Sequence, residues 1–277
     1  MDVNYKVAVV TGSSSGIGFE TSLVLARNNF HTYATMRNRE RGTKMRAVQS
    51  GENLPIKIIQ LDVTSDKSVR EAIQSILSES GRIDVLVNNA GFGLVGAFEE
   101  LDMDEIKQQY ETNFFGVIRV TQAVIPIMKE QKSGIIVNIS SGAGRFGYPG
   151  GSAYVSTKFA LEGLSESISY ELEPFGIKVA LVEPGFVKTN FSNVIAKRSQ
   201  EPDSEYSKMM EKMAGRMEEM RRNASSSELV ANIVLEAVTT KNPNLRYLAG
   251  IDVEQWIEQK TKLSDKEFFN MIKKSLL

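Results

Sequence analysis

The stretch Thr11-Gly12-Ser13-Ser14-Ser15-Gly16-Ile17-Gly18 leaves a short apolar run and opens a segment with helical period. Free backbone N–H groups at the start of a helix, together with the helix dipole, favour an anion. The glycine spacing is GxxxGxG, and no Gly-Lys-Ser/Thr closes the turn as an ATP-type P-loop requires. A tight strand-to-helix connection is the alternative interpretation. We predict a pyrophosphate seat formed by Gly12, Ser14, Ser15, Gly16, Ile17 and Gly18.

From this turn onward, short β-branched runs alternate with longer stretches of helical period, which is typical of a parallel sheet with crossover helices. The predicted strands are Lys6–Thr11, His31–Met36, Ile56–Leu61, Val85–Asn88, Gly134–Ile139, Lys178–Val182 and Arg246–Ala249. The predicted helices are Gly16–Asn28, Glu40–Gln49, Asp66–Glu79, Met103–Lys132, Ser152–Pro174 and Ser226–Thr240. We predict an α/β fold: a Rossmann-like, doubly wound, parallel seven-stranded sheet with helices on both faces, in a single domain over 1–277.

Composition excludes several other classes of protein. Lys and Arg number 33 against 34 Asp and Glu, without a long block of like charge, so no nucleic-acid partner is expected. The chain has no cysteine and a single histidine, His31, which argues against disulfides, thiolate chemistry and an imidazole metal site. The apolar run Val7–Val10 is too short for a membrane segment. We expect no metal, no integral membrane segment and a cytoplasmic location.

Small polar residues and glycines follow the predicted strands. Ligands of such sheets bind beyond the carboxyl ends of the strands, so these residues are candidates for one common site. They are Asn88-Asn89-Ala90-Gly91, Ser140-Ser141-Gly142 and Pro184-Gly185.

A tyrosine and a lysine stand four residues apart at the start of the helix predicted over Ser152–Pro174. This spacing puts Tyr154 and Lys158 on one face. A phenol is a poor base at neutral pH, but a neighbouring ammonium lowers its pKa. Tyr154 is therefore a candidate proton donor and acceptor.

With these motifs in order over Lys6–Thr189, the chain resembles the short-chain dehydrogenase/reductase family. The matching features are TGSSSGIG at 11–18, Asn-Asn-Ala-Gly at 88–91, Asn113, Ser141, Tyr-Val-Ser-Thr-Lys at 154–158 and Pro184-Gly185. The resemblance implies an oxidoreductase that transfers a hydride between nicotinamide and a carbonyl or alcohol, with no metal. The implied catalytic residues are Asn113, Ser141, Tyr154 and Lys158, with Asn113 holding a water beside the lysine. The implied cofactor contacts are Asp62, Val63, Asn89, Ala90, Gly91, Tyr154, Lys158, Pro184, Gly185, Val187 and Thr189. The alternative is a dinucleotide-binding regulatory or scaffold protein without turnover.

The end of the second predicted strand bears on the choice of dinucleotide. An acidic residue in this region binds an adenosine 2′-hydroxyl, whereas an arginine accommodates a 2′-phosphate. Met36 stands where the acid would be, and Arg37 follows it, with Arg39 and Arg41 nearby. We predict that NADP(H) is preferred and that NAD(H) is possible.

Two C-terminal segments depart from the alternating pattern. An insertion at about 190–223 contains Met209, Met213, Met217 and Met220 at helical spacing, as either a docked helix or a mobile lid over an apolar substrate. The segment 252–277 is predicted to form a helical extension. The insertion and Tyr33–Arg37 are similar to hydroxysteroid and retinol dehydrogenases. The resemblance also implies a homodimer or homotetramer formed through Met103–Lys132 and Ser152–Pro174. The expected pocket is surrounded by the methionines of the insertion and by Phe92, Leu94, Phe146, Tyr148, Phe186 and Phe191, a lining that suits an apolar or amphipathic small-molecule substrate.

Overall fold

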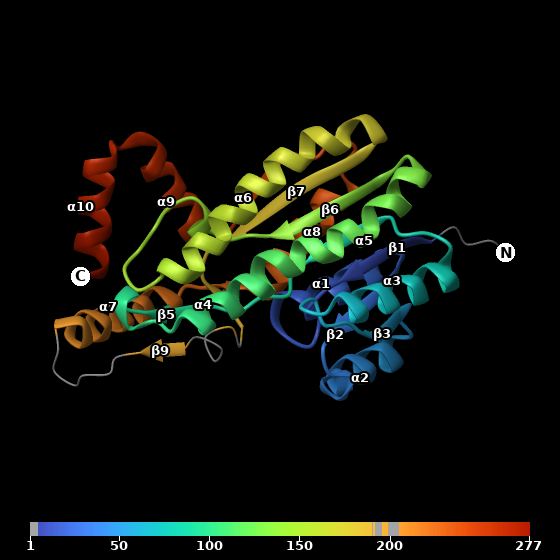
Figure 1. Ribbon diagram of the computed structural model, residues 1–277, viewed down its shortest axis with the longest axis horizontal. Helices are drawn as coiled ribbons and strands as arrows, with labels where there is room; N and C mark the ends of the chain where they lie inside the picture. The colour runs from blue at the N-terminus through green and yellow to red at the C-terminus, as the bar shows by residue number, and fades with distance from the viewer. Residues whose placement is uncertain (1–4, 190, 192–195, 199–204) are drawn as a thin grey trace.

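We describe a computed structural model of the chain, which covers residues 5–189, 191, 196–198 and 205–277. Its centre is a seven-stranded sheet in which every neighbouring pair is parallel (Figure 1). The strand order is β3 (Ile56–Gln60), β2 (Phe30–Met36), β1 (Lys6–Val10), β4 (Val85–Asn88), β6 (Gly134–Ile139), β7 (Ile177–Pro184) and β11 (Arg246–Ala249). The predicted doubly wound fold is confirmed.

Helices cover both faces of this sheet. The connecting and C-terminal helices are α1 (Gly16–Arg27), α2 (Thr43–Glu52), α3 (Asp66–Ser80), α4 (Met103–Tyr110), α5 (Gly116–Gln131), α6 (Ser152–Leu172), α7 (Glu205–Arg221), α8 (Ser227–Thr239), α9 (Ile251–Lys262) and α10 (Asp265–Leu276). Side chains alternate along a strand, so β1 directs Val7 and Val9 toward α3 and α5, and Ala8 and Val10 toward α1 and α8. The sheet is therefore apolar on both faces.

The structure departs most clearly from expectation over the predicted helix Met103–Lys132. The helix is interrupted between α4 and α5 by one turn of π-helix, Glu111–Phe115, which contains Asn113. The predicted helix Glu40–Gln49 is also displaced, because a 3-10 turn at Arg39–Gly42 precedes α2. The π-helical turn accompanies the contact of Asn113 with the Phe92 backbone, 21 positions earlier, which a local pattern does not contain.

The C-terminal third adds a second group of helices at one end of the molecule. In Figure 1, α7, α9 and α10 lie together at the end opposite the N terminus. The methionine face of α7 packs on α10, with Met213 buried against Phe268 and Ile272. Three two- or three-residue strands, β8 (Val187–Lys188), β9 (Ala196–Arg198) and β10 (Ser225–Ser226), border this region, and β9 pairs with β5 (Leu94–Gly96).

Parts of the predicted insertion at 190–223, namely 190, 192–195 and 199–204, lie outside the described residues. Within the described part, the methionine repeat forms α7, as the helical spacing predicted. Among all the residues that the structure describes, no helix is both long enough and apolar enough to cross a bilayer.

Candidate active site

A cavity of about 1090 Å³ opens at the carboxyl ends of the parallel strands. It contains the point where the strand order reverses, between β1 and β4, which is where doubly wound sheets bind ligands. With the exception of Gly18, every predicted site residue lines it: Gly12, Ser14, Ser15, Gly16, Ile17, Arg37, Asp62, Val63, Asn89, Ala90, Gly91, Asn113, Ser141, Tyr154, Lys158, Pro184, Gly185, Val187 and Thr189.

The glycine turn is shaped by close contacts with the strand β4 end. Gly12 has φ +69°, and a Cβ there would lie 2.8 Å from Ala90 Cα, so glycine is required twice over. The Asn89 side chain donates hydrogen bonds to the Thr11 and Gly12 carbonyl oxygens at 2.9 and 3.2 Å. Asn89 therefore holds the turn in place, a role that the sequence did not indicate.

Gly18, predicted as part of the pyrophosphate seat, is not among the residues that line the cavity. Gly18 is buried within the turn, where a Cβ would overlap the Asn89 amide nitrogen and the Gly12 carbonyl oxygen. Its part is to let α1 approach β4. Ser15 precedes α1 and lines the cavity, but its side chain does not cap the helix. The first backbone N–H groups of α1 therefore donate no hydrogen bond to the Ser15 side chain.

Two cationic side chains lie just after the end of strand β2. Arg37 and Arg41 line the cavity together with Asn38, whose carboxamide oxygen accepts from the Glu40 N–H at 2.9 Å. Met36 is buried, and Arg39 does not line the cavity. Of the two nearby arginines, Arg39 and Arg41, only Arg41 lines the cavity with Arg37.

On the opposite wall, a serine, a tyrosine and a lysine converge from different elements. Ser141 follows β6, and its hydroxyl lies beside the phenol of Tyr154 on α6. The Ser141 hydroxyl also accepts from the Ala143 N–H at 3.2 Å and donates to the Pro184 carbonyl at 3.4 Å. The Lys158 ammonium is buried, donates to the Ile139 carbonyl at 2.8 Å, and lies 5.6 Å from the centroid of the Tyr154 ring.

The electrostatics of this wall differ from the expectation. Burial raises the pKa of Tyr154 to about 12, because the phenolate is poorly solvated, and the hydrogen bond from Ser141 partly offsets this. Burial lowers the pKa of Lys158 to about 8, against the attraction of Glu162. The predicted lowering of the Tyr154 pKa by Lys158 is therefore not found: the ammonium is held by Ile139, and burial dominates.

Asn113 lies at the cavity wall in the π-helical turn, with 2% of its surface exposed. Its amide group donates to the Phe92 carbonyl at 2.8 Å and to the Thr157 hydroxyl at 3.4 Å, and its oxygen accepts from the Phe92 N–H at 3.1 Å. The side chain thus fixes the backbone beyond β4, which leaves it little capacity to hold a water as well.

In the remaining cavity wall, the sequence anticipated aromatic residues and methionines but missed the contributions of α9 and α10. This wall is apolar and comes from the C-terminal helices and the loop after β6, with Phe146 stacked on Trp256 at a centroid distance of 5.7 Å. Further side chains of this wall are Val95, Tyr148, Phe186, Phe191, Met217, Met220, Ile272 and Leu276. Only the aromatic residues and the methionine repeat gave any signal, because the contribution of α10 depends on its packing against α7.

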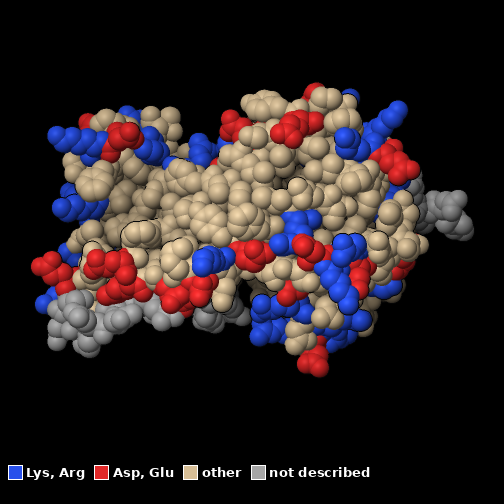
Figure 2. All heavy atoms as spheres, in the orientation of Figure 1, with Lys and Arg blue, Asp and Glu red and all other residues tan. Residues whose placement is uncertain are grey.

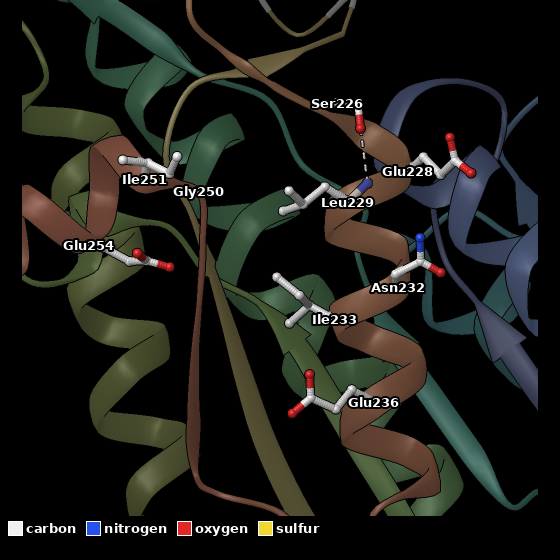
Figure 3. Close-up of a pocket in the computed structure, with 9 residues that line it drawn as sticks. All are labelled: Ser226, Glu228, Leu229, Asn232, Ile233, Glu236, Gly250, Ile251 and Glu254. Carbon is white, nitrogen blue, oxygen red and sulfur yellow. Dashed lines mark hydrogen bonds between the residues drawn. The ribbon is translucent and has the colours of Figure 1, made fainter.

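A second, separate depression lies between α8 and α9 (Figure 3). It is lined by Leu229, Ile233 and Ile251 with three glutamates around them, and Ser226 caps α8 by accepting from the Leu229 N–H at 3.1 Å. None of the predicted site residues lines it. The chemistry therefore belongs to the larger cavity.

Comparison with known proteins agrees with this geometry. The short chain dehydrogenase family profile matches residues 6–200. The chain is 39% identical over 254 residues to the uncharacterized oxidoreductase YusZ of Bacillus subtilis, covering 90% of each chain. It is 36% identical over 249 residues to the 3-ketodihydrosphingosine reductase of Bacteroides thetaiotaomicron, covering 88% of each.

Solved structures give the same result. A short-chain dehydrogenase from Streptomyces avermitilis superposes with a TM-score of 0.85 at 33% identity, covering 99% of this chain and 98% of that one. The closed form of a serine dehydrogenase in complex with NADP⁺ has a TM-score of 0.75 at 27% identity, covering 87% and 93%. This chain belongs to the short-chain dehydrogenase family of oxidoreductases, enzymes that act on CH–OH and C=O groups.

Proposed function

We propose that this protein is an NADP(H)-dependent reductase of an apolar or amphipathic ketone or aldehyde, with Tyr154 as the proton donor. The observation that carries the proposal is the convergence of Ser141, Tyr154 and Lys158 on one wall of the cavity whose opposite end holds Arg37. The named relatives are oxidoreductases or dehydrogenases, which gives no support to a dinucleotide-binding protein without turnover.

When bound, the dinucleotide supplies or accepts a hydride. Tyr154 gives the proton to the substrate oxygen, and the Ser141 hydroxyl donates a hydrogen bond to the same oxygen as negative charge develops there. The Lys158 ammonium, one helical turn from the tyrosine, stabilises the phenolate that remains, and it would hold the sugar beside the nicotinamide when the dinucleotide is bound. Asn113 keeps the Phe92 backbone and the π-helical turn in register behind Lys158.

The electrostatics of the wall keep the phenol of Tyr154 protonated in the ligand-free protein. With a pKa of about 12, the Tyr154 phenol is protonated throughout the neutral range and is ready to give its proton. Acting as a base would require the phenolate, which burial disfavours. A cation near the phenol favours the phenolate, and the Lys158 ammonium, 5.6 Å from the centroid of the Tyr154 ring, is placed to contribute this charge in either direction of the reaction.

The residues present fit a phosphorylated dinucleotide. The helix α1 start has no side-chain cap, Gly12 leaves no room for a Cβ, and the cavity wall continues to Arg37 and Arg41. Two guanidinium groups and no acidic side chain at the end of β2 suit a 2′-phosphate and not a free 2′-hydroxyl. The NADP⁺-bound serine dehydrogenase supports the same choice.

The substrate half of the cavity supports an apolar compound. Its wall is built from aromatic rings and methionines, including Phe146, Trp256 and Met217. We infer that the described part of the insertion, α7, forms this wall as a docked element whose methionines adapt to the substrate. A relative that reduces 3-ketodihydrosphingosine is consistent with a long apolar chain in such a space.

The experiment that tests the function is a panel of carbonyl compounds with the purified protein. The panel runs from short aldehydes to bulky and long-chain ketones, and NADPH consumption is followed by absorbance with product identified by mass spectrometry. We expect turnover to rise with apolar surface of the substrate, because the wall loses water on binding. If NADPH is not consumed with any member while the folded protein binds it, the proposal is wrong.

We further propose a homodimer or homotetramer formed through α5 and α6. Figure 2 shows a broad area over these helices that is mostly free of charged side chains, and Phe115, Phe159 and Tyr170 are 46%, 46% and 72% exposed. Exposed apolar patches of this kind mark association surfaces. Light scattering is expected to give two or four times the monomer mass of 30.7 kDa, and a monomer at micromolar concentration would contradict it.

A further inference from the structure

The face of α6 that carries Tyr154 and Lys158 continues with a third ionisable residue. Glu162 follows Lys158 by four residues, so the three side chains share one face of the helix. Glu162 is 5% exposed, whereas the Glu166 side chain, one turn further on, is 47% exposed. A glutamate is almost never buried this deeply unless it is paired, so the position of Glu162 needs an explanation.

The carboxylate of Glu162 is only half satisfied. Oε2 accepts from Arg246 Nε at 2.9 Å, and Oε1 has no hydrogen-bond partner among the described residues. Arg246 on β11 also bonds Glu166 at 2.7 Å and lies 3.4 Å from Glu183 on β7. Glu183 is fully buried and accepts from Arg145 at 3.1 Å. Three carboxylates thus share two guanidinium groups.

The free oxygen of Glu162 faces the segment that holds Lys158. A Cβ at Gly144 would lie 3.2 Å from Glu162 Oε1 and 2.9 Å from the Ser140 hydroxyl, so both oxygens adjoin Gly144. The Ser140 hydroxyl is also buried without a partner among the described residues. Ser140 directly follows Ile139, whose carbonyl accepts from Lys158. Glu162 Oε1 and the Lys158 ammonium therefore lie near consecutive residues of one segment, Ser140 and Ile139 respectively.

The charges of this group of carboxylates and guanidinium groups do not balance without Lys158. Glu162, Glu166 and Glu183 carry three negative charges when ionised, against two from Arg145 and Arg246. The Lys158 ammonium is the third cation on this side of α6. Buried like charges disfavour full ionisation, and an opposite charge favours it, so the state of Lys158 depends on Glu162.

The pKa shifts of Lys158 and Glu183 agree with this coupling. The attraction of Glu162 opposes the loss of the Lys158 proton, although burial still lowers the pKa of Lys158 to about 8. Burial and the proximity of Glu162 raise the pKa of Glu183 to about 7, against Arg145 and Arg246. Lys158 and Glu183 thus both change charge close to neutral pH.

We propose that Glu162 is a positioning residue that keeps Lys158 in its ammonium form through a buried cluster with Arg246, Glu183 and Arg145. The proposal rests on the proposed function, in which the Lys158 ammonium acts beside Tyr154. It extends the functional face of α6 by one helical turn, to Glu162, which does not line the cavity.

The test compares Glu162→Gln with Glu166→Gln. Each variant removes one carboxylate partner of Arg246, but only Glu162 acts on Lys158. The titration of Lys158 is followed by NMR of ¹³C-lysine protein without cofactor or substrate, assigned with Lys158→Met. In Glu162→Gln we expect the midpoint to fall by roughly one pH unit, because an attractive charge is lost. In Glu166→Gln it should stay at the wild-type value.

A second readout is the pH dependence of NADPH-linked reduction. Lys158 must be protonated, so activity is expected to fall as pH rises through its midpoint, and this limb should move to lower pH only in Glu162→Gln. An unchanged midpoint in Glu162→Gln, or an equal shift in both variants, would overturn the proposal. Since the NMR measurement needs no turnover, it can fail while the carbonyl panel succeeds, and the reverse.

Should Glu162→Gln not fold, a second variant still decides the matter. The fallback variant is Glu162→Asp, which keeps the negative charge but shortens the side chain by one methylene and so withdraws the carboxylate from the segment at Ser140. The Lys158 midpoint should then fall in the same direction as in Glu162→Gln, by a smaller amount. A midpoint equal to that of the wild type would overturn the proposal.

Discussion

Replacing Tyr154 by phenylalanine is expected to lower kcat by about 10³-fold while leaving the dissociation constant of NADPH within about twofold. The loss corresponds to about 4 kcal/mol of transition-state stabilisation. The ring keeps its packing, including its edge contact with Phe191 at a centroid distance of 5.7 Å, but the proton donor disappears. Turnover is measured by NADPH absorbance with the best substrate of the panel, and binding by quenching of Trp256 fluorescence.

Tyr170→Phe provides the matched control for this variant. It makes the same substitution on the same helix at a side chain that is 72% exposed, so activity should be unchanged. Near-normal turnover in Tyr154→Phe would remove Tyr154 from the mechanism. A parallel loss of NADPH binding would point instead to a collapse of the cavity wall.

The architecture could be predicted because its determinants are local. The glycine turn, the alternation of short β-branched runs with amphipathic segments, and the polar residues after each strand all act within a few residues of one another. The same holds for Tyr154 and Lys158, whose separation alone fixes their common face. Strand β1, for example, ends at Val10, one residue from the predicted boundary.

Features decided by distant partners could not be predicted. The π-helical turn exists where the Asn113 side chain reaches the Phe92 backbone, and no periodicity records that contact. Glu162 and Glu166 are indistinguishable in the helical pattern, yet only Glu162 is buried. Its burial depends on Arg246, which lies 84 positions later and was predicted only as the first residue of a strand.

The balance of electrostatic effects at Tyr154 is a further example. The four-residue spacing predicts a lowered phenol pKa, since an ammonium favours the phenolate. In the folded protein, desolvation outweighs that effect, and Lys158 donates to Ile139 instead. Burial and hydrogen-bond competition are tertiary quantities, so the sign of the shift could not be obtained from spacing.

Removing the guanidinium of Arg37 is expected to change which dinucleotide the enzyme uses. In Arg37→Ala, kcat/KM for NADPH should fall about 30-fold, equivalent to about 2 kcal/mol for a lost charge-assisted hydrogen bond. The value for NADH should remain within about twofold, because NADH has no 2′-phosphate. Adding Arg41→Ala should lower the NADPH value further, since Arg41 lines the same end of the cavity.

Arg39→Ala separates a specific contact from a general effect of positive charge. Arg39 lies in the same turn and carries the same charge, but it does not line the cavity. Its main-chain carbonyl accepts a hydrogen bond from Arg46 at 3.1 Å. If long-range attraction dominated, Arg39→Ala would lower the NADPH value as much as Arg37→Ala, and increasing salt would abolish the difference from wild type. If Arg37 contacts the phosphate directly, Arg39→Ala should differ little from wild type. A double variant Arg37→Ala/Arg41→Ala that retained the wild-type ratio of NADPH to NADH efficiency would mean that the end of β2 does not select the dinucleotide.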